Sequence, residues 1–283
     1  MSDTSNCTLS TCPMSDAYID YLPNVPANAF FVALFALIFS IQLFAGVWYR
    51  TWAYMGAMLP GLILEVLGYV GRLMLHHNPF NFNSFLLYLI CLTIAPAFFS
   101  AAIYICLGKI ITIYGTQLAR FRPRTYTIIF VSCDITSLIL QAAGGAIASI
   151  ADSNQVSLQN TGVNIMIAGL AFQVASLFLF MVLATEFIFS VHKNSKLERN
   201  DEFTGLREQL KWKMFLYCLG LATVTIFIRS TFRVAELKGG FSSALANNQV
   251  DLMVLESSMV SIACICLTAA HPAFIIGRTW SSL

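Results

Sequence analysis

The stretch from Trp52 to Leu75 reads WAYMGAMLPGLILEVLGYVGRLML, and it is apolar except for an acid and a base placed inside it. It exceeds the ~20 residues that a helix needs to cross ~30 Å of hydrocarbon. Helix is the expected form, because lipid offers an exposed backbone no hydrogen-bond partners. A charge at the bilayer centre costs at least roughly 2.5–3.5 kcal/mol on insertion scales. We therefore expect Glu65 to face a protein interior or a wet cavity, as we do for Asp134, Arg229 and Glu256 in later apolar stretches. Arg72 lies near the end of its stretch, where its side chain could snorkel to the membrane surface.

Six further stretches have the same apolar character, so the predicted spans are Ala27–Tyr49, Trp52–Leu75, Ser84–Leu107, Thr125–Ile150, Gly162–Ser190, Trp212–Thr231 and Val250–Gly277. The chain has 283 residues, of which 58% are hydrophobic and 11% charged, with a mean hydropathy of +0.73. Soluble domains carry about 25% charged residues. The sequence therefore predicts an all-α integral membrane bundle of seven transmembrane helices.

The chain divides into one membrane domain and two tails. Residues 27–278 form the predicted seven-helix domain, residues 1–26 an extracellular N-terminal tail and residues 279–283 a short cytoplasmic tail. No basic segment precedes the first span, so we interpret it as a retained helix and not a signal peptide. A net charge of +2 is too small to suggest nucleic-acid binding.

The distribution of Lys and Arg predicts the orientation. With the N-terminus outside, twelve of the 16 basic residues fall in cytoplasmic loops or ends. The four at or near the outer side are Arg72, Arg229, Arg233 and Lys238. This asymmetry satisfies the positive-inside rule, so we expect an N-out, C-in protein.

The N-terminal tail carries two small features that fit an outside location. Asn6-Cys7-Thr8 is an acceptor pattern for N-glycosylation at Asn6. Cys7 and Cys12 either pair in an oxidising space or remain free thiols. The other six cysteines lie in predicted spans as small apolar fillers. No Cys/His spacing resembles a metal site, and we expect no cofactor.

The second span places three polar side chains on one helix face. Glu65, Tyr69 and Arg72 follow i, i+4, i+7 spacing. One interpretation is the polar wall of a binding pocket, with Glu65 accepting a proton or a cation. The alternative is an interhelical hydrogen bond that fixes packing.

Spans three to five contribute further candidates. Asp134 and Gln141 share a face of span four, and either a functional or a structural role fits Asp134. Gln173 in span five fits a hydrogen bond between helices better than a ligand site. Pro96, in the middle of span three, frees a carbonyl and usually bends a helix.

Span six ends with Arg229, Arg233 and Glu236, again at i, i+4, i+7. Two guanidiniums could clamp a phosphate or carboxylate headgroup. The alternative is an Arg233–Glu236 pair, with Arg229 neutralising Glu65 or Glu256. We hypothesise one internal polar site, reached from outside or from the outer leaflet, that contains Glu65, Arg72, Gln141, Gln173, Arg229 and Glu256.

At these residues the sequence resembles the fungal RTA-like family, lipid-translocating exporters named for resistance to aminocholesterol. The matching pieces are Glu65-x-x-Gly68-Tyr69-x-x-Arg72, Ala95-Pro96 with Ala101 and Tyr104, Asp134-x6-Gln141-x2-Gly144-Gly145, Gly169 with Gln173, Ile228-Arg229-x3-Arg233-x2-Glu236, and His271-Pro272. The chain departs from the family pattern before span seven, where Gln249, Asp251 and Glu256 replace an acidic residue, an aromatic and an aspartate.

The resemblance implies a seven-span fungal membrane protein. Family members are associated with release of sphingoid long-chain bases, with tolerance of toxic sterols and drugs and, in one branch, with porphyrin or haem movement. We expect a lipid exporter of this kind, multi-pass in the plasma membrane and not an enzyme, whose partners are a lipid or amphiphile and the bilayer.

Two other functions stay open at this point. A seven-span receptor or lipid-stress sensor would suit the N-out topology, with the loop His192–Lys211 meeting a partner. The motifs of the common G-protein-coupled type are absent from the sequence. An intramembrane lipid-modifying enzyme could use Glu65, Asp134 and His271 for acid–base chemistry. No phosphate-cradling G-x-x-x-x-G-K-[ST] occurs, which argues against direct ATP drive.

Overall fold

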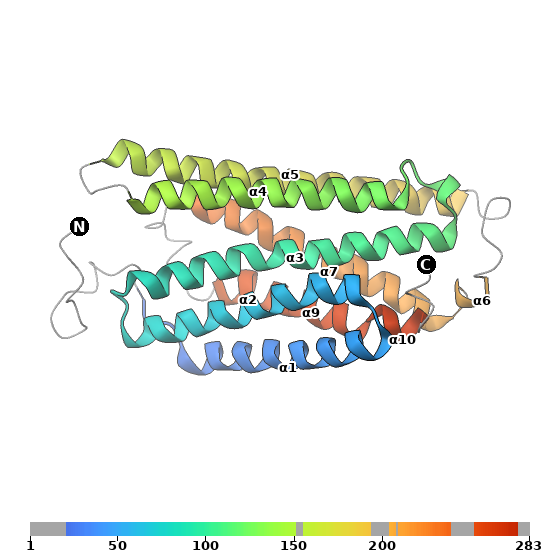
Figure 1. Cartoon of the computed structure of the whole chain (residues 1–283), viewed down its shortest axis with the longest axis horizontal. Helices are drawn as coiled ribbons and strands as arrows, with labels where there is room; N and C mark the ends of the chain where they lie inside the picture. Colours follow the sequence, from blue (N-terminus) through green and yellow to red (C-terminus); the bar gives the residue numbers. More distant parts are fainter. Residues whose placement is uncertain (1–20, 151–154, 194–203, 208, 239–251, 277–283) are drawn as a thin grey trace.

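The computed structural model describes residues 21–150, 155–193, 204–207, 209–238 and 252–276, and within them the elements are helices laid along one another (Figure 1). The long helices are α1 (Val25–Tyr49), α2 (Trp52–His77), α3 (Phe82–Tyr114), α4 (Pro123–Ile150), α5 (Val156–Lys193) and α7 (Leu210–Lys238). The shorter ones are η3 (Thr116–Leu118), α6 (Thr204–Arg207), the π-helix η5 (Leu252–Ser258), α9 (Met259–Ala269) and α10 (Pro272–Ile276). Asn6, Cys7, Cys12 and the tail 279–283 lie outside the described residues.

The predicted all-α bundle of seven membrane helices is confirmed. Six of the described helices are long and apolar enough to cross a membrane. A shorter apolar helix, Met253–Ala269, supplies the seventh span. Large apolar side chains on the outside of the bundle, such as Phe44, Ile139 and Phe189, are 60–70% exposed and would face lipid.

The helices extend beyond several of the predicted spans. α3 continues to Tyr114, where Gly115 with φ 121° ends it, and α5 already begins at Val156. Hydropathy locates the part of a helix that lies in hydrocarbon. The helix itself continues until its terminal backbone groups find other partners.

The seventh span differs most from its prediction as one continuous segment, Val250–Gly277. Within the described residues it begins as the π-helix η5, continues as α9, stops at Ala269 and resumes as α10 at Pro272. Pro272 has no N–H to donate, and its ring disfavours helical backbone at His271. The predicted segment therefore contains the seventh span, Met253–Ala269, and the break before Pro272 is a feature that hydropathy does not register.

α3 occupies the centre of the bundle. Successive long helices run in opposite directions, so their connections alternate between two ends (Figure 1). α3 packs against α2, α4 and α7. In its most apolar 18-residue window 56% of the residues are buried, against 28% in α1 and α4. A polar side chain that reaches α3 is therefore inside the protein and away from lipid.

α4 and α5 approach each other so closely that their contact requires glycine. A Cβ built on Gly144 would lie 2.5 Å from the Met166 nitrogen, and one on Gly162 would lie 2.5 Å from the Ala148 nitrogen. Small residues of this kind let membrane helices pack backbone to backbone. The two helices consequently form a tight pair along one side of the bundle.

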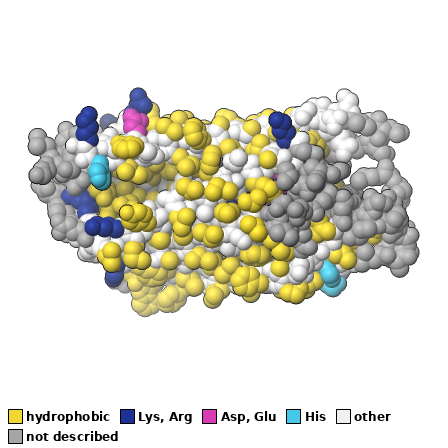
Figure 2. Space-filling model, turned by 180° about the vertical axis from the view of Figure 1, so that it is seen from behind, with side chains coloured by type: hydrophobic (Ala, Val, Ile, Leu, Met, Phe, Trp, Pro, Cys, Tyr) yellow, Lys and Arg dark blue, Asp and Glu magenta, His cyan; other side chains and the backbone are white. Residues whose placement is uncertain are grey.

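Basic side chains gather at one end of the face shown in Figure 2, while hydrophobic side chains cover the middle. The α1–α2 and α3–α4 connections carry the exposed Arg50, Arg120 and Arg122, and they lie at the same end of the bundle (Figure 1). The positive-inside rule assigns this end to the cytoplasm. The orientation itself stays a prediction.

Candidate functional site

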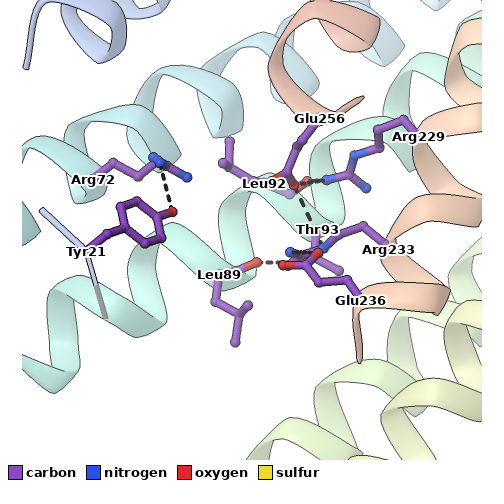
Figure 3. A network of polar contacts seen from close by, with 9 residues as sticks. All are labelled: Tyr21, Arg72, Leu89, Leu92, Thr93, Arg229, Arg233, Glu236 and Glu256. Carbon is purple, nitrogen blue, oxygen red and sulfur yellow. Dashed lines mark hydrogen bonds and ion pairs between the residues drawn. The ribbon is translucent and has the colours of Figure 1, made fainter. Parts of the chain in front are cut away.

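Three charged side chains of α7 share one face and are buried in the bundle. Arg229, Arg233 and Glu236 are only 2%, 1% and 5% exposed. At ~1.5 Å per residue, Arg229 lies roughly 14 Å along the helix from Lys238, the last residue of α7. The charges are thus enclosed by protein within an apolar span (Figure 3).

Arg229 joins α7 to two other elements. Its Nη2 donates to Oε1 of Glu256 in η5 at 2.9 Å, and both side chains are 2% exposed. The same nitrogen also donates to the Leu92 carbonyl of α3. Leu92 precedes Pro96 by four residues, so it is the carbonyl that the proline leaves without a helical donor. Arg229 therefore supplies the hydrogen bond that the Leu92 carbonyl lacks because of Pro96.

Arg233 forms the second part of the network (Figure 3). Its Nη1 donates to Oε2 of Glu236 at 2.7 Å, and its Nη2 donates to Oγ1 of Thr93 at 3.0 Å. Its Nε lies 3.8 Å from Oε1 of Glu256. Of the alternatives raised by the sequence, the structure contains the Arg233–Glu236 pair and the neutralisation of Glu256 by Arg229.

The face of α2 that carries Glu65 and Tyr69 lies next to this network. Glu65 is 1% exposed, and its Oε1 has no hydrogen-bond partner among the described residues. It lies within electrostatic range of Arg229 and Glu256. The Tyr69 ring is stacked between α1 aromatics, with centroid distances of 5.1 Å to Phe31 and 5.7 Å to Phe35.

Arg72 is a buried cation whose hydrogen-bond partners are neutral side chains. It is 1% exposed. Its Nε donates to Oδ1 of Asn28 at 3.0 Å, its Nη2 donates to the Tyr21 hydroxyl at 3.2 Å, and its guanidinium carbon lies 5.1 Å from the centroid of the Tyr88 ring. Among the described residues its Nη1 has no partner. Glu256 lies within electrostatic range.

We call these six side chains the charge cluster: Glu65, Arg72, Arg229, Arg233, Glu236 and Glu256. They come from α2, α7 and η5 and carry three acidic and three basic groups. All six side chains are buried in the protein. This is expected, because a charge that faced the lipid interior would be costly. Within the described part of the chain, five buried polar atoms of the cluster have no hydrogen-bond partner: Oε1 of Glu65, Nη1 of Arg72, Nε of Arg229, Nε of Arg233 and Oε2 of Glu256.

Gln141 and Gln173 lie apart from the charge cluster. Nε2 of Gln141 donates to Oε1 of Gln173 at 3.1 Å and to Oγ of Ser137 at 2.7 Å. Ser137 in turn donates to the Gly169 carbonyl at 2.9 Å. These bonds link α4 to α5 and give the two amides the packing role expected for Gln173. The single polar site hypothesised from the sequence is thus two separate groups.

Asp134 belongs to a third location. It is 4% exposed and lies beside the Tyr104 hydroxyl of α3. Within the described residues neither carboxylate oxygen has a partner in hydrogen-bonding geometry. Asp134 therefore stands at the α3–α4 contact and not in the charge cluster.

Sequence reasoning did not single out Asn28, Thr93 or Tyr88, which surround the arginines. Asn28 lies in the first turn of α1 and is 1% exposed. An amide inside an apolar stretch was the available signal for it. Thr93 follows the freed carbonyl of Leu92 directly, so its place beside Pro96 was a second signal. Nothing in the sequence indicated the Tyr88 contact.

Two surface grooves lie elsewhere on the described part of the protein. One, of about 460 Å³, runs between α1 and Phe274 of α10. The other, of about 500 Å³, lies between α5 and α7 and reaches Lys238. Both are lined mostly by apolar side chains that face lipid. Over the same described ranges, no group of three or more His, Cys, Asp or Glu side chains could hold a metal ion.

The chain is similar to fungal membrane proteins of known names. The sequence model described as "RTA1 like protein" matches residues 58–279. The "Sphingoid long-chain base transporter RSB1" of Saccharomyces cerevisiae is 33% identical over 99% of this chain and 82% of its own length.

Two further relatives from the same yeast are more distant. "Protein RTM1" is 26% identical over 79% of this chain and 66% of its own length. "Protoporphyrin uptake protein 1" is 29% identical over 70% of this chain and 61% of its own length. No solved structure matches.

Proposed function

The chain belongs to the RTA1-like family, and from that premise we propose that it translocates sphingoid long-chain bases or related amphiphiles across the membrane and gives tolerance to toxic lipids. The observation that carries the proposal is the charge cluster, because it offers an unused acceptor and an unused donor inside a membrane bundle. The similarity to a named base transporter over nearly the whole chain supports the choice of substrate.

The chemistry of the headgroup fits two of the atoms without partners, Oε1 of Glu65 and Nη1 of Arg72. A sphingoid base carries an ammonium next to hydroxyl groups, on a long hydrocarbon tail. The ammonium would bind Oε1 of Glu65, and Nη1 of Arg72 would donate to a hydroxyl oxygen at an earlier point on the path of the headgroup. Both side chains stand on one face of α2, about two helical turns apart. The hydrocarbon tail would lie along apolar helix surfaces that already face lipid.

The paired charges have a different role from the unpaired ones. Glu236 and Glu256 already accept hydrogen bonds from guanidiniums. They neutralise Arg233 and Arg229 and hold α7, η5 and α3 together around the headgroup site. Glu65 and Arg72 therefore bind substrate in this proposal, while Tyr69, Arg229, Arg233 and Glu256 shape the site. Gln141 and Gln173 support it through the α4–α5 contact.

The remaining expectations complete the proposal. The protein lies in the plasma membrane with its N-terminus outside, and the base moves without covalent chemistry on the lipid. Residues 1–26 form the outer tail, residues 27–278 the membrane domain and residues 279–283 the inner tail. Asn6 in the outer tail is the proposed glycosylation site.

Transport in purified proteoliposomes tests the proposal. The wild-type protein should speed the movement of a sphingoid base between the leaflets relative to empty liposomes. Glu65→Gln should abolish the gain, since it removes the anion while keeping the shape of the side chain. Asp134→Asn is the matched control, because it neutralises a buried carboxyl outside the charge cluster, and it should retain transport.

The failure of this experiment has a clear meaning. If the wild-type protein moves base no faster than empty liposomes, direct translocation of that substrate is wrong and the lipid-stress sensor becomes the better hypothesis. If Glu65→Gln transports as well as wild type, the charge cluster is not on the substrate path.

A further inference from the structure

Glu65 differs from the other two carboxylates of the charge cluster. Glu236 and Glu256 each accept a hydrogen bond from a guanidinium, at 2.7 Å and 2.9 Å. Glu65 is equally buried, yet within the described residues its Oε1 meets no donor. An isolated carboxylate without a hydrogen bond is very unfavourable in an apolar interior, whereas a protonated carboxyl is neutral.

Among the described residues around Glu65, none provides a cation that is not already paired. The charged or titratable groups that act with it electrostatically are Tyr69 on its own helix, Cys91 of α3, Arg229 of α7, Glu256 of η5 and Cys264 of α9. α1 has no Asp, Glu, Lys, Arg or His between Val25 and Tyr49. Arg229 is the one cation in this set, and it already binds Glu256 and the Leu92 carbonyl.

We propose that Glu65 carries a proton while the headgroup site is empty and releases it when an ammonium headgroup binds, so that base and proton exchange. This inference rests on the proposed function. The carboxyl O–H bond breaks, the proton passes to water, and the carboxylate that remains pairs with the ammonium. A neutral group is replaced by a neutral ion pair, so the total charge of the buried site does not change.

Constant charge is the physical advantage of the exchange. With Glu65 protonated, the charge cluster has three cations and two anions, a net charge of +1. Adding an ammonium without losing a proton would raise this net charge to +2 in a low-dielectric interior, which is costly. A proton gradient across the membrane would then drive the base in the opposite direction to the proton. The exchange thus gives the transporter an energy source that needs no nucleotide.

Proton release on binding tests the inference. The probe is a sphingoid base with a trimethylated nitrogen, whose headgroup keeps its charge and has no proton to lose. It is titrated into the purified protein in weak buffer with a pH indicator, while bound probe is counted separately. Wild type should release close to one proton per bound base. Its affinity should weaken about tenfold for each pH unit as the medium becomes more acidic.

Three variants complete the experiment. Glu65→Gln should release no proton, Glu65→Asp should restore release, and Asp134→Asn should release as wild type does. If wild type binds the probe without releasing a proton, the exchange is wrong but the proposed function stays in place. The same holds if Glu65→Gln still releases a proton on binding. If wild type shows no saturable binding of the probe, the headgroup site itself is wrong, and both proposals fall.

Discussion

Arg229 makes two contacts with residues that lie far apart in the sequence. It neutralises Glu256 of η5, and it caps the Leu92 carbonyl that Pro96 deprives of a donor. Removing one partner of a buried ion pair leaves an uncompensated charge, and this usually costs more than removing both. Arg229 should therefore be the residue on which the stability of the charge cluster depends most.

The first prediction concerns this pair. Arg229→Met should lower the free energy of unfolding by about 3–5 kcal/mol, because Glu256 then loses its hydrogen-bonded cation and keeps only the 3.8 Å contact with Nε of Arg233. Arg229→Met combined with Glu256→Met should recover most of that loss. Reversible unfolding in mixed micelles measures both. A double variant that is less stable than Arg229→Met would contradict the pairing.

At the residue scale the sequence predicted which side chains are unusual but not all of their partners. Intramembrane position marked Glu65, Arg229 and Glu256 as buried polar groups, because lipid excludes charge. Helical spacing also predicted the Arg233–Glu236 pair as an alternative. Arg229 pairs with Glu256 and not with Glu65 because of how α7 and η5 pack. Periodicity within one helix contains no information about packing between helices.

At the scale of elements, α3 shows how one proline shapes the surroundings of the charge cluster. Pro96 leaves the Leu92 carbonyl free, and the side chains of α7 reach α3 at that carbonyl and at the adjacent Thr93. The proline could be located from the sequence. The helix whose side chain bonds this carbonyl could not be identified from the sequence, because Arg229 lies 137 residues from Leu92 along the chain.

The second prediction follows from this contact. Pro96→Ala supplies an N–H that can bond the Leu92 carbonyl within α3. The Arg229→Met loss should then be smaller by about 1–3 kcal/mol in the Pro96→Ala background, since the carbonyl no longer becomes unsatisfied. A double-mutant cycle on unfolding free energies measures the coupling. Strict additivity of the two changes would contradict the link.

The third prediction concerns the α4–α5 pair. Gly144→Ala should destabilise the protein by about 1–3 kcal/mol, because its Cβ would meet the Met166 nitrogen at 2.5 Å. Gly145→Ala is the control, since its Cβ meets nothing closer than the Met166 sulfur at 4.0 Å. Thermal unfolding of the two variants compares them directly. Equal stability would mean that the helices do not approach as closely as described.

At the scale of the whole molecule, the number of spans and the helical class followed from hydropathy alone. Lipid leaves few alternatives to a helix bundle, so this part of the fold is strongly determined by composition. The break at Pro272 and the division of the polar residues into separate groups were missed. Both depend on helix packing and rotation, which the hydrophobic pattern of a nearly uniformly apolar helix does not specify.

The fourth prediction concerns orientation. The exposed residues His77, at the α2 end, and Arg122, before α4, lie at opposite ends of the bundle. His77→Cys should gain labelling by a membrane-impermeant thiol reagent in intact cells, over the background of the unchanged chain. Arg122→Cys should gain it only after the membrane is opened. The reverse pattern would mean that the N-terminus is inside.

The account rests on the headgroup of the substrate lying in the charge cluster, and photocrosslinking measures that position most directly. The probe is a sphingoid base with a photoreactive group beside its ammonium, and unmodified base serves as competitor. The account predicts competable label on α2 near Glu65 and on η5 near Glu256. Competable label confined to the α4–α5 pair or to the lipid-facing grooves would contradict it.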